Sequence, residues 1–202
     1  MTGDSKIGVV ILAAGASSRL GSPKQLVEFH GKALLQHMID IAASMDFYSK
    51  VLVLGANLDQ VKDGIDSADF AVVNNDDWEK GMASSIRKGL KRSLEIEEEL
   101  DHLLILLSDQ PFVTKEEIRK LISRQLQNDI KATFSQYNED IGVPAIFSKE
   151  AFSDLRNLRG DHGAKKLIYQ KEFEFKTVRF QKGDFDVDTK EDVELLKQLE
   201  NK

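Results

Sequence analysis

A glycine-rich segment near the N-terminus combines small residues with two cations. It spans residues 12–25 and reads LAAGASSRLGSPKQ. Small residues let backbone amides approach a phosphate closely, and Arg19 and Lys24 can neutralise its anionic oxygens. The spacing differs from that of a P-loop and from the dinucleotide fingerprint G-x-G-x-x-G. The segment therefore indicates a phosphate-binding loop of another kind, although a surface turn with two solvated cations has the same composition.

Two aspartates have the chemistry of magnesium ligands. Asp109 follows an apolar run and precedes Pro111, so it is expected where a strand leaves a sheet. Magnesium usually takes one or two protein carboxylates together with phosphate oxygens and water. Asp188 is the second candidate and shares a side with Asp186 if that segment is extended. The alternatives are local, because Asp-Gln-Pro is common turn chemistry and Asp-x-Asp-Thr can cap a helix.

A second polar group could meet a nucleotide. Ser84 and Ser85 lie at the start of a predicted helix, where free amides can bind an anion or a base edge, and N-capping is the simpler role. Asn75 follows a predicted strand and could contact base or ribose, or only form a turn. His162 could carry a proton, because histidine is the side chain that most often does so near neutral pH, but a surface or ligand-contacting role is more usual.

The elements that must position these residues alternate along the chain. Apolar runs at residues 7–13, 50–54, 70–73 and 102–107 predict buried strands, and amphipathic stretches at 33–45, 59–65 and 84–94 predict helices. Thr114 begins a capping box and a helix to about residue 127, and Thr189 caps a last helix to about residue 199. This alternation predicts one domain over residues 1–202, a three-layer α/β/α sandwich with a mostly parallel, Rossmann-like sheet. The loops that follow three of the strands should then open onto one rim.

Composition narrows the class of partner. The net charge of −6 argues against a nucleic-acid surface, and the absence of cysteine excludes thiol nucleophiles and cysteine-ligated metals. The apolar run at 7–13 could pass for a short secretion signal, but the cations and glycines that follow are not needed in a cleavage region. No run approaches the roughly 18 residues of a membrane span. We therefore expect a cytoplasmic protein that contacts neither nucleic acid nor membrane.

The glycine-rich segment resembles the L-A-A-G-x-S-x-R-x-G-x-x-K motif of nucleotidyltransferases with the MobA-like fold. Further motifs agree in order and spacing, and the resemblance is closest to the MocA-like molybdenum cofactor cytidylyltransferases. It extends from about residue 7 to residue 199. The six motifs lie at residues 12–25, 81–90, 107–111, 142–147, 160–164 and 186–189.

The resemblance, added to the reading of the residues above, implies a set of roles. Catalysis is assigned to Arg19, Lys24 and Asp109, and a magnesium ion, the implied cofactor, to Asp109 and Asp188. The nucleotide is expected beside Leu12, Ala13, Ala14, Gly15, Arg19, Lys24, Asn75, Gly81, Ser84, Ser85 and Asp109. The acceptor is expected beside Gly142, Pro144, Gly160, Asp161, His162 and Gly163.

The implied reaction transfers CMP from CTP to the terminal phosphate of the molybdopterin cofactor and releases pyrophosphate. A recipient molybdoenzyme is a further possible partner. The GTP-using branch has glycine where this chain has Ala14, which favours the smaller pyrimidine base. Two alternatives stay open: another cytidylyl- or sugar-phosphate nucleotidyltransferase, because Ser22-Pro23-Lys24-Gln25 also resembles methylerythritol-phosphate cytidylyltransferases, and a non-catalytic carrier of the molybdenum cofactor.

Overall fold

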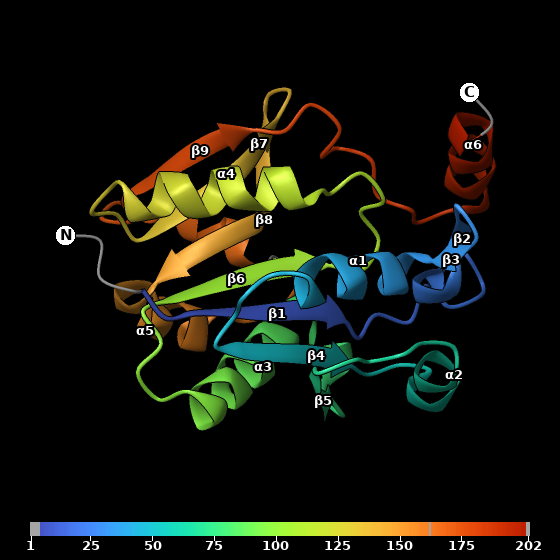
Figure 1. The fold of residues 1–202 in the computed structure, drawn as a ribbon, viewed down its shortest axis with the longest axis horizontal. Coiled ribbons are helices and arrows are strands. Elements are labelled where there is room, and N and C mark those ends of the chain that lie inside the picture. Colours follow the sequence, from blue (N-terminus) through green and yellow to red (C-terminus); the bar gives the residue numbers. More distant parts are fainter. Residues whose placement is uncertain (1–4, 162, 201–202) are drawn as a thin grey trace.

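The core of the molecule is a seven-stranded sheet (Figure 1). The computed structural model describes residues 5–161 and 163–200. The strand order is β5-β4-β1-β6-β8-β7-β9, with β2 and β3 in a separate hairpin. The strands are β1 (Ile7–Ala13), β2 (Glu28–Phe29), β3 (Lys32–Ala33), β4 (Ser49–Leu54), β5 (Ala71–Asn74), β6 (His102–Leu107), β7 (Ala132–Tyr137), β8 (Asp140–Ser148) and β9 (Phe175–Arg179).

The sheet is mostly parallel, as predicted. Strands β5, β4, β1 and β6 run parallel in that order, and β7 and β9 are parallel to each other. Only β8 is antiparallel to its two neighbours, β6 and β7. The carboxyl ends of β5, β4, β1 and β6 therefore meet at one edge of the sheet, which is where such sheets bind ligands.

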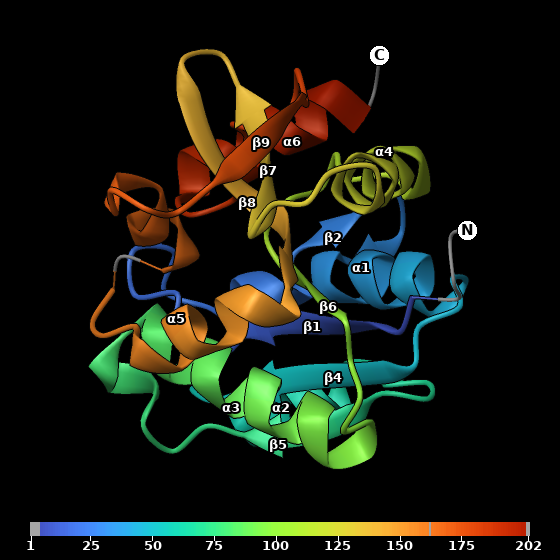
Figure 2. The same cartoon turned by 90° about the vertical axis from the view of Figure 1, so that its left-hand side faces the viewer.

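Helices cover both faces and make the predicted three layers (Figure 2). The helices are α1 (Leu34–Ala43), α2 (Leu58–Asp63), α3 (Met82–Ile96), α4 (Lys115–Leu126), α5 (Phe152–Asn157) and α6 (Lys190–Glu200). Side chains of β1 alternate between the faces: Val10 and Leu12 pack with α3 and α5, whereas Val9 and Ile11 pack with α1, α2 and α4. Burial on both faces requires such a continuously apolar strand.

Helix α3 lies unusually close to the sheet. A Cβ placed on Gly89 would lie only 2.5 Å from Cγ1 of Val10, so a larger residue there would push the helix away from β1. The helix begins at Met82, two residues before the predicted start, after the short 3-10 helix η2 (Trp78–Lys80). This close packing fixes the N-terminus of α3 beside the carboxyl end of β1.

The C-terminal helix α6 packs away from the main sheet, against the β2–β3 hairpin (Figure 1). Its Leu196, together with Val187 just before the helix, joins Phe29 and Leu34 in a small separate core. The last part of the chain thereby returns to the region of the glycine-rich segment. Asp186 and Asp188 lie in no strand, because residues 180–189 form a loop between β9 and α6.

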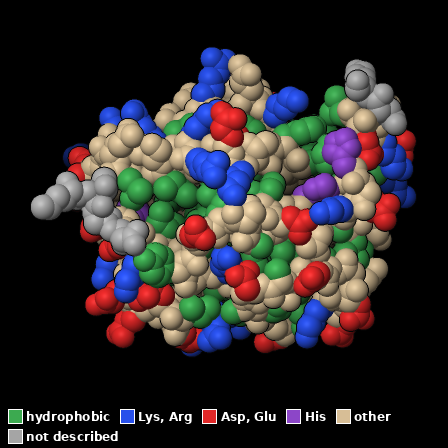
Figure 3. All heavy atoms as spheres, in the orientation of Figure 1, with side chains coloured by type: hydrophobic (Ala, Val, Ile, Leu, Met, Phe, Trp, Pro, Cys, Tyr) green, Lys and Arg blue, Asp and Glu red, His purple; other side chains and the backbone are tan. Residues whose placement is uncertain are grey.

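The surface has no single dominant charge on the face shown in Figure 3, where acidic and basic side chains are interspersed. Among the described residues, no helix has both the length and the apolar character needed to cross a bilayer.

Candidate active site

A cleft opens at the carboxyl edge of the parallel strands. Its volume is about 380 Å³, and four chain segments line it: the loop after β1, the start of α3 with η2, the end of β6, and Asp161 in the loop after α5. The sequence predicted that the loops after β1 and β6 would share one rim, and they do. The lining residues are Leu12, Ala13, Ala14, Gly15, Ala16, Ser17, Ser18, Lys24, Gln25, Trp78, Glu79, Gly81, Met82, Ser85, Leu107, Ser108, Asp109 and Asp161.

The loop after β1 presents its backbone to this cleft. A Cβ built on Gly15 would meet no atom within 4 Å, so the chain there is open to a ligand. Within residues 5–161 and 163–200, the amides of Gly15, Ala16 and Ser18 donate to no other protein group. Unpaired amides grouped on one loop are suited to binding an anion.

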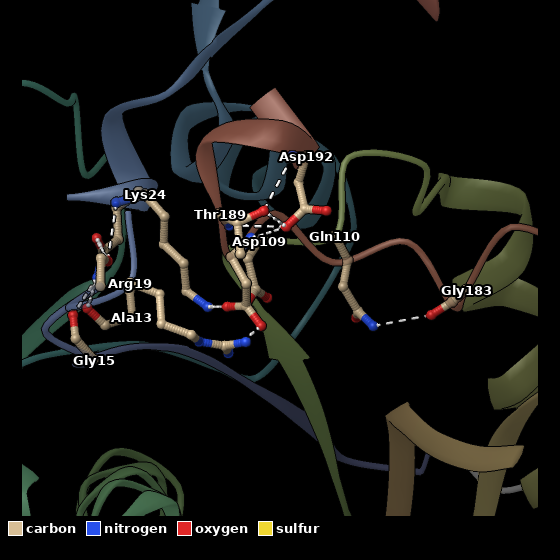
Figure 4. Close-up of polar contacts among 12 residues, drawn as sticks. Ala13, Gly15, Arg19, Lys24, Asp109, Gln110, Gly183, Thr189 and Asp192 are labelled. Carbon is tan, nitrogen blue, oxygen red and sulfur yellow. Dashed lines mark hydrogen bonds and ion pairs between the residues drawn. The ribbon is translucent and has the colours of Figure 1, made fainter. Parts of the chain in front are cut away.

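The two cations of the loop lie on two carboxylates (Figure 4). The Lys24 ammonium Nζ is 2.5 Å from Oδ2 of Asp109 and 2.6 Å from Oδ1 of Asp188. Arg19 Nη2 lies 2.6 Å from the other oxygen of Asp188. Residues separated by more than 160 positions in the chain thus form one ion cluster, with Lys24 largely buried and Arg19 at the solvent edge.

The charges of the cluster shift the pKa values of its members. Burial opposes the charge of Lys24, but the charges and hydrogen bonds of Asp109 and Asp188 outweigh burial and raise the pKa of Lys24. Burial likewise opposes ionisation of Asp188, yet Lys24 and Arg19 hold the pKa of Asp188 below its usual value. For Asp186, burial together with the negative charge of Asp109 raises the pKa to about 7. The carboxylates at this edge therefore repel one another wherever no cation lies between them.

The loop that carries Asp188 is fastened to the end of β6. The amide of Val187 donates to the carbonyl of Asp109 at 3.1 Å. Nε2 of Gln110 lies 3.4 Å from the carbonyl of Gly183, as drawn in Figure 4, and 3.1 Å from that of Val143. These contacts explain why Asp109 and Asp188 converge although no strand leads to Asp188.

Helix capping and ion binding are divided between neighbouring residues. The amide of Asp192 donates to Oγ1 of Thr189 at 3.2 Å, and Oδ2 of Asp192 accepts from the amides of Thr189 and Asp188. The predicted cap by Thr189 is confirmed. The Asp188 side chain takes no part in the cap and points instead to Lys24 and Arg19.

The donor set at this edge fits a divalent cation that also binds phosphate. Oδ1 of Asp109 is buried and has no hydrogen-bond partner among residues 5–161 and 163–200. Nor do three His, Cys, Asp or Glu side chains of the described residues cluster to hold a metal by themselves. Two carboxylates with an unsatisfied oxygen are nevertheless the kind of protein ligand set that magnesium uses when phosphate and water supply the remaining ligands.

Asn75 and Ser84 lie behind the wall of the cleft rather than on it. The Asn75 side chain is fully buried and donates to Oγ of Ser84 and of Ser85, at 2.8 and 2.9 Å. Ser84 Oγ lies within 2.8 Å of the Gly81 carbonyl, so its hydroxyl is also used internally. Of these three residues only Ser85 lines the cleft. The polar group holds the start of α3 against the end of β5.

The predicted acceptor residues occupy two places. Asp161 lines the cleft, and the carbonyl of Gly160 accepts from the amide of Ala83 at 3.1 Å. A Cβ on Gly81 would lie 2.2 Å from Oδ1 of Asp161, so the loop at 160–161 packs directly on the start of α3. Gly163 packs similarly on the sulfur of Met82. His162 lies outside the described residues.

Gly142 and Pro144 are strand residues rather than loop residues. Both belong to β8, which pairs with β6 up to Ile105 and Ala145, so they continue toward the edge that carries Asp109. The phenol of Tyr137 packs on Gly142, and the carbonyl of Pro144 accepts from Ser135. Gly142 and Pro144 do not line the cleft that the glycine-rich loop borders. They therefore lie on the β8 side of β6, whereas the glycine-rich loop follows β1 on the other side of β6.

Comparison with known families decides what kind of domain this is. A model of the MobA-like NTP transferase domain matches residues 9–175. The chain belongs to this family. The match contains the glycine-rich loop, α3, the end of β6 and Asp161, and so covers all four segments that line the cleft.

Two relatives of this MobA-like domain differ in length and in name. The bifunctional protein GlmU of Buchnera aphidicola subsp. Schizaphis graminum is 31% identical over 148 residues, which are 71% of this chain and 31% of that protein. The chain thus spans about a third of the GlmU length. The nicotine blue oxidoreductase of Paenarthrobacter nicotinovorans is 28% identical, over 94% of this chain and 93% of its own.

Solved structures share the fold along almost the whole chain. A homologue of Mycobacterium tuberculosis Rv0371c from Mycobacterium sp. strain JC1 has a TM-score of 0.83 and 30% identity, over 96% of each chain. Rv0371c of M. tuberculosis H37Rv, in a structure with manganese, has a TM-score of 0.77 and 28% identity, over 95% of this chain and 98% of its own.

Proposed function

We propose that this MobA-like domain transfers CMP from CTP to the terminal phosphate of a molybdopterin-type acceptor and releases pyrophosphate. The observation that carries the proposal is the cleft itself, in which unpaired loop amides lie beside Lys24, and Lys24 contacts both Asp109 and Asp188. A triphosphate needs anion donors and a divalent cation at the same place. The choice of CTP and of the molybdopterin acceptor rests on the resemblance described above.

In this mechanism the protein positions the reactants and neutralises charge. The acceptor phosphate attacks the α-phosphorus of CTP in line, the bond to the β-phosphate oxygen breaks, and pyrophosphate leaves. Lys24 and Arg19 turn from the carboxylates to the phosphate oxygens and stabilise the charge that moves onto pyrophosphate. No protein nucleophile is required, because positioning and electrostatics account for such transfers.

A divalent cation completes the site in this proposal. Asp109 and Asp188 would hold magnesium. Oδ1 of Asp109, which has no hydrogen-bond partner among the described residues, would be available as a ligand of the ion. The bound cation supplies Lewis-acid stabilisation of the phosphate oxygens. Support for a metal comes from Rv0371c, a relative whose structure contains manganese. We expect weak binding to the free protein, because Lys24 lies between the same two carboxylates.

Three other functions make different predictions. A different cytidylyl- or sugar-phosphate nucleotidyltransferase would release pyrophosphate with another acceptor. A cofactor carrier would bind molybdopterin without releasing pyrophosphate. A redox function, which the name of one full-length relative raises, would need neither CTP nor the Lys24 cluster.

The test is a pyrophosphate-release assay with each nucleoside triphosphate against several acceptors. The acceptors are the molybdopterin cofactor, methylerythritol phosphate and hexose 1-phosphates. We expect release with CTP and the molybdopterin cofactor and little with the others. Release only with another acceptor would overturn the acceptor assignment, and no release with any pair would overturn nucleotidyl transfer.

A further inference from the structure

The glycine-rich loop is held from behind by one buried side chain, Gln25. Gln25 is fully buried, and its amide Nε2 lies 2.9 Å from the carbonyl of Ala13 and 3.0 Å from that of Gly15. An amide nitrogen carries two hydrogens, so both are donated to the loop. The carbonyl between these two, that of Ala14, accepts from the amide of Ala56 at 3.0 Å. Three successive carbonyls are therefore bound on the protein side.

The oxygen of Gln25 is linked to the same loop through Ser17. Oγ of Ser17 lies 3.4 Å from Oε1 of Gln25 and accepts from the amide of Lys24 at 3.0 Å. Ser17 has a positive φ of 55°, a conformation that a residue with a side chain adopts only when its surroundings enforce it. The amides of Leu20 and Gly21 then donate to the Ser17 carbonyl and close the turn.

We infer that Gln25 is a positioning residue, which keeps the amides of the loop facing the cleft by binding its carbonyls. Gln25 borders the cleft, but its side chain is fully buried and its amide hydrogens are donated to the loop, so it acts through the loop and not by touching the ligand. This inference rests on the proposed function only in that the ligand is a polyphosphate. Nothing in it depends on the base or on the acceptor.

The test compares two buried glutamines. Gln25→Met keeps the length of the side chain but has no donor. Gln125 is the matched control, because it is 1% exposed, donates to the carbonyl of Ile130 at 2.9 Å and accepts from Thr133, far from the cleft. Each Met variant leaves buried carbonyls without a donor, so both should lose stability to a similar degree.

Two measurements on the full chain separate positioning from a merely structural role. Amide hydrogen exchange over residues 14–23 should be at least about tenfold faster in Gln25→Met and unchanged in Gln125→Met, since of the two glutamines Gln25 is the one bonded to this loop. Binding of inorganic tripolyphosphate with Mg²⁺, measured by calorimetry, should weaken at least about tenfold in Gln25→Met only, because the donors are no longer preorganised.

A third variant tests the donor directly. Gln25→Glu has almost the same shape but places a carboxylate oxygen against the two loop carbonyls, so it should be no better than Gln25→Met. In steady-state kinetics of the Gln25 variants, the KM for the nucleotide should rise by a larger factor than kcat falls. Unchanged loop exchange in both Gln25 variants would overturn the inference. Failure of the wild type to bind tripolyphosphate would instead overturn the phosphate site, with the exchange result still deciding the role of Gln25.

Discussion

At the scale of single residues, the central feature is a lysine that occupies the place between two carboxylates. Lys24 is neutralised by Asp109 and Asp188 in the ligand-free protein, and Asp188 is further shared with Arg19. A triphosphate offers the two cations an alternative partner and frees the carboxylates for a metal. Binding of nucleotide and of metal should therefore favour each other.

Lys24→Ala should lower turnover by about 10²-fold or more, the scale for losing one electrostatic stabiliser of a transition state. A matched control is Lys50→Ala, since the Lys50 side chain is similarly buried, at 13% exposure against 17%, and pairs with Asp69 away from the cleft. Steady-state kinetics of the folded variants would measure both. Near-normal turnover in Lys24→Ala would contradict the role of this lysine.

The same substitution should strengthen metal binding to the free protein. Without the ammonium, Asp109 and Asp188 repel each other and become available as metal ligands. The Kd for Mn²⁺ without nucleotide should therefore fall at least about tenfold, which corresponds to ~1.4 kcal/mol of binding free energy. Electron paramagnetic resonance of free Mn²⁺ would measure this for wild type, Lys24→Ala and the control Lys50→Ala. Equal Mn²⁺ affinity in the three proteins would show that Lys24 does not compete with a metal.

Ala14 should set the preference for the base. Ala14 lines the cleft, and its methyl group lies close to Gly55. One methyl in such a pocket is worth about 1–3 kcal/mol, so kcat/KM should favour CTP over GTP, though not absolutely. Ala14→Gly should reduce this preference, whereas Ala16→Gly on the same loop should not. Equal kcat/KM of the wild type for CTP and GTP would refute the assignment.

At the scale of elements, two helices bring distant parts of the chain to the cleft. Helix α3 packs closely on β1 at Gly89. Helix α6 packs on the β2–β3 hairpin, and Asp188, two residues before this helix, contacts Lys24. The cap of α6 is therefore linked to the ion cluster, because Oδ2 of Asp192 also accepts from the amide of Asp188.

Loss of this cap should affect function as well as stability. Thr189→Ala should cost about 1 kcal/mol of unfolding free energy, the usual value for an N-cap, and should also weaken nucleotide binding by loosening Asp188. Thr114→Ala is the control, since Thr114 caps α4 with a 3.2 Å bond from the amide of Glu117. Chemical denaturation and CTP titration would compare the two. Equal CTP affinity in both variants would show that the cap does not position Asp188.

At the scale of the whole molecule, the parallel half of the fold was predictable and the other half was not. Strands β1, β4 and β6 are apolar because they are buried on both faces, and such runs are visible in sequence. Strand β5 lies at the edge of the sheet and is only partly buried, but its run Ala71–Val73 is also apolar. Strands β7, β8 and β9 mix polar and apolar residues, so only a motif at 142–147 was recognisable within them. The helix caps at Thr114 and Thr189 were predictable because they depend on residues three apart.

The site was predictable where function depends on local spacing and not where it depends on tertiary contacts. The loop at residues 12–25 and Asp109 were identified from motifs. The pairing of Lys24 with both carboxylates, the burial of Asn75 and the support by Gln25 depend on segments that meet only in the folded chain. No signal in one sequence reports that Gln25 has its hydrogens pointing at loop carbonyls.

The most direct test of nucleotidyl transfer follows the α-phosphate of CTP. The protein is incubated with α-³²P-labelled CTP, the molybdopterin cofactor and Mg²⁺, and the label is located by chromatography, with Asp109→Asn and a chelator as controls. Asp109→Asn keeps a neutral oxygen but loses the charge that holds the metal, so its rate should fall by several orders of magnitude. We expect the label in the acceptor and none in pyrophosphate. In the controls, neither labelled acceptor nor pyrophosphate should form. An unlabelled acceptor, or transfer that survives the chelator or Asp109→Asn, would contradict it.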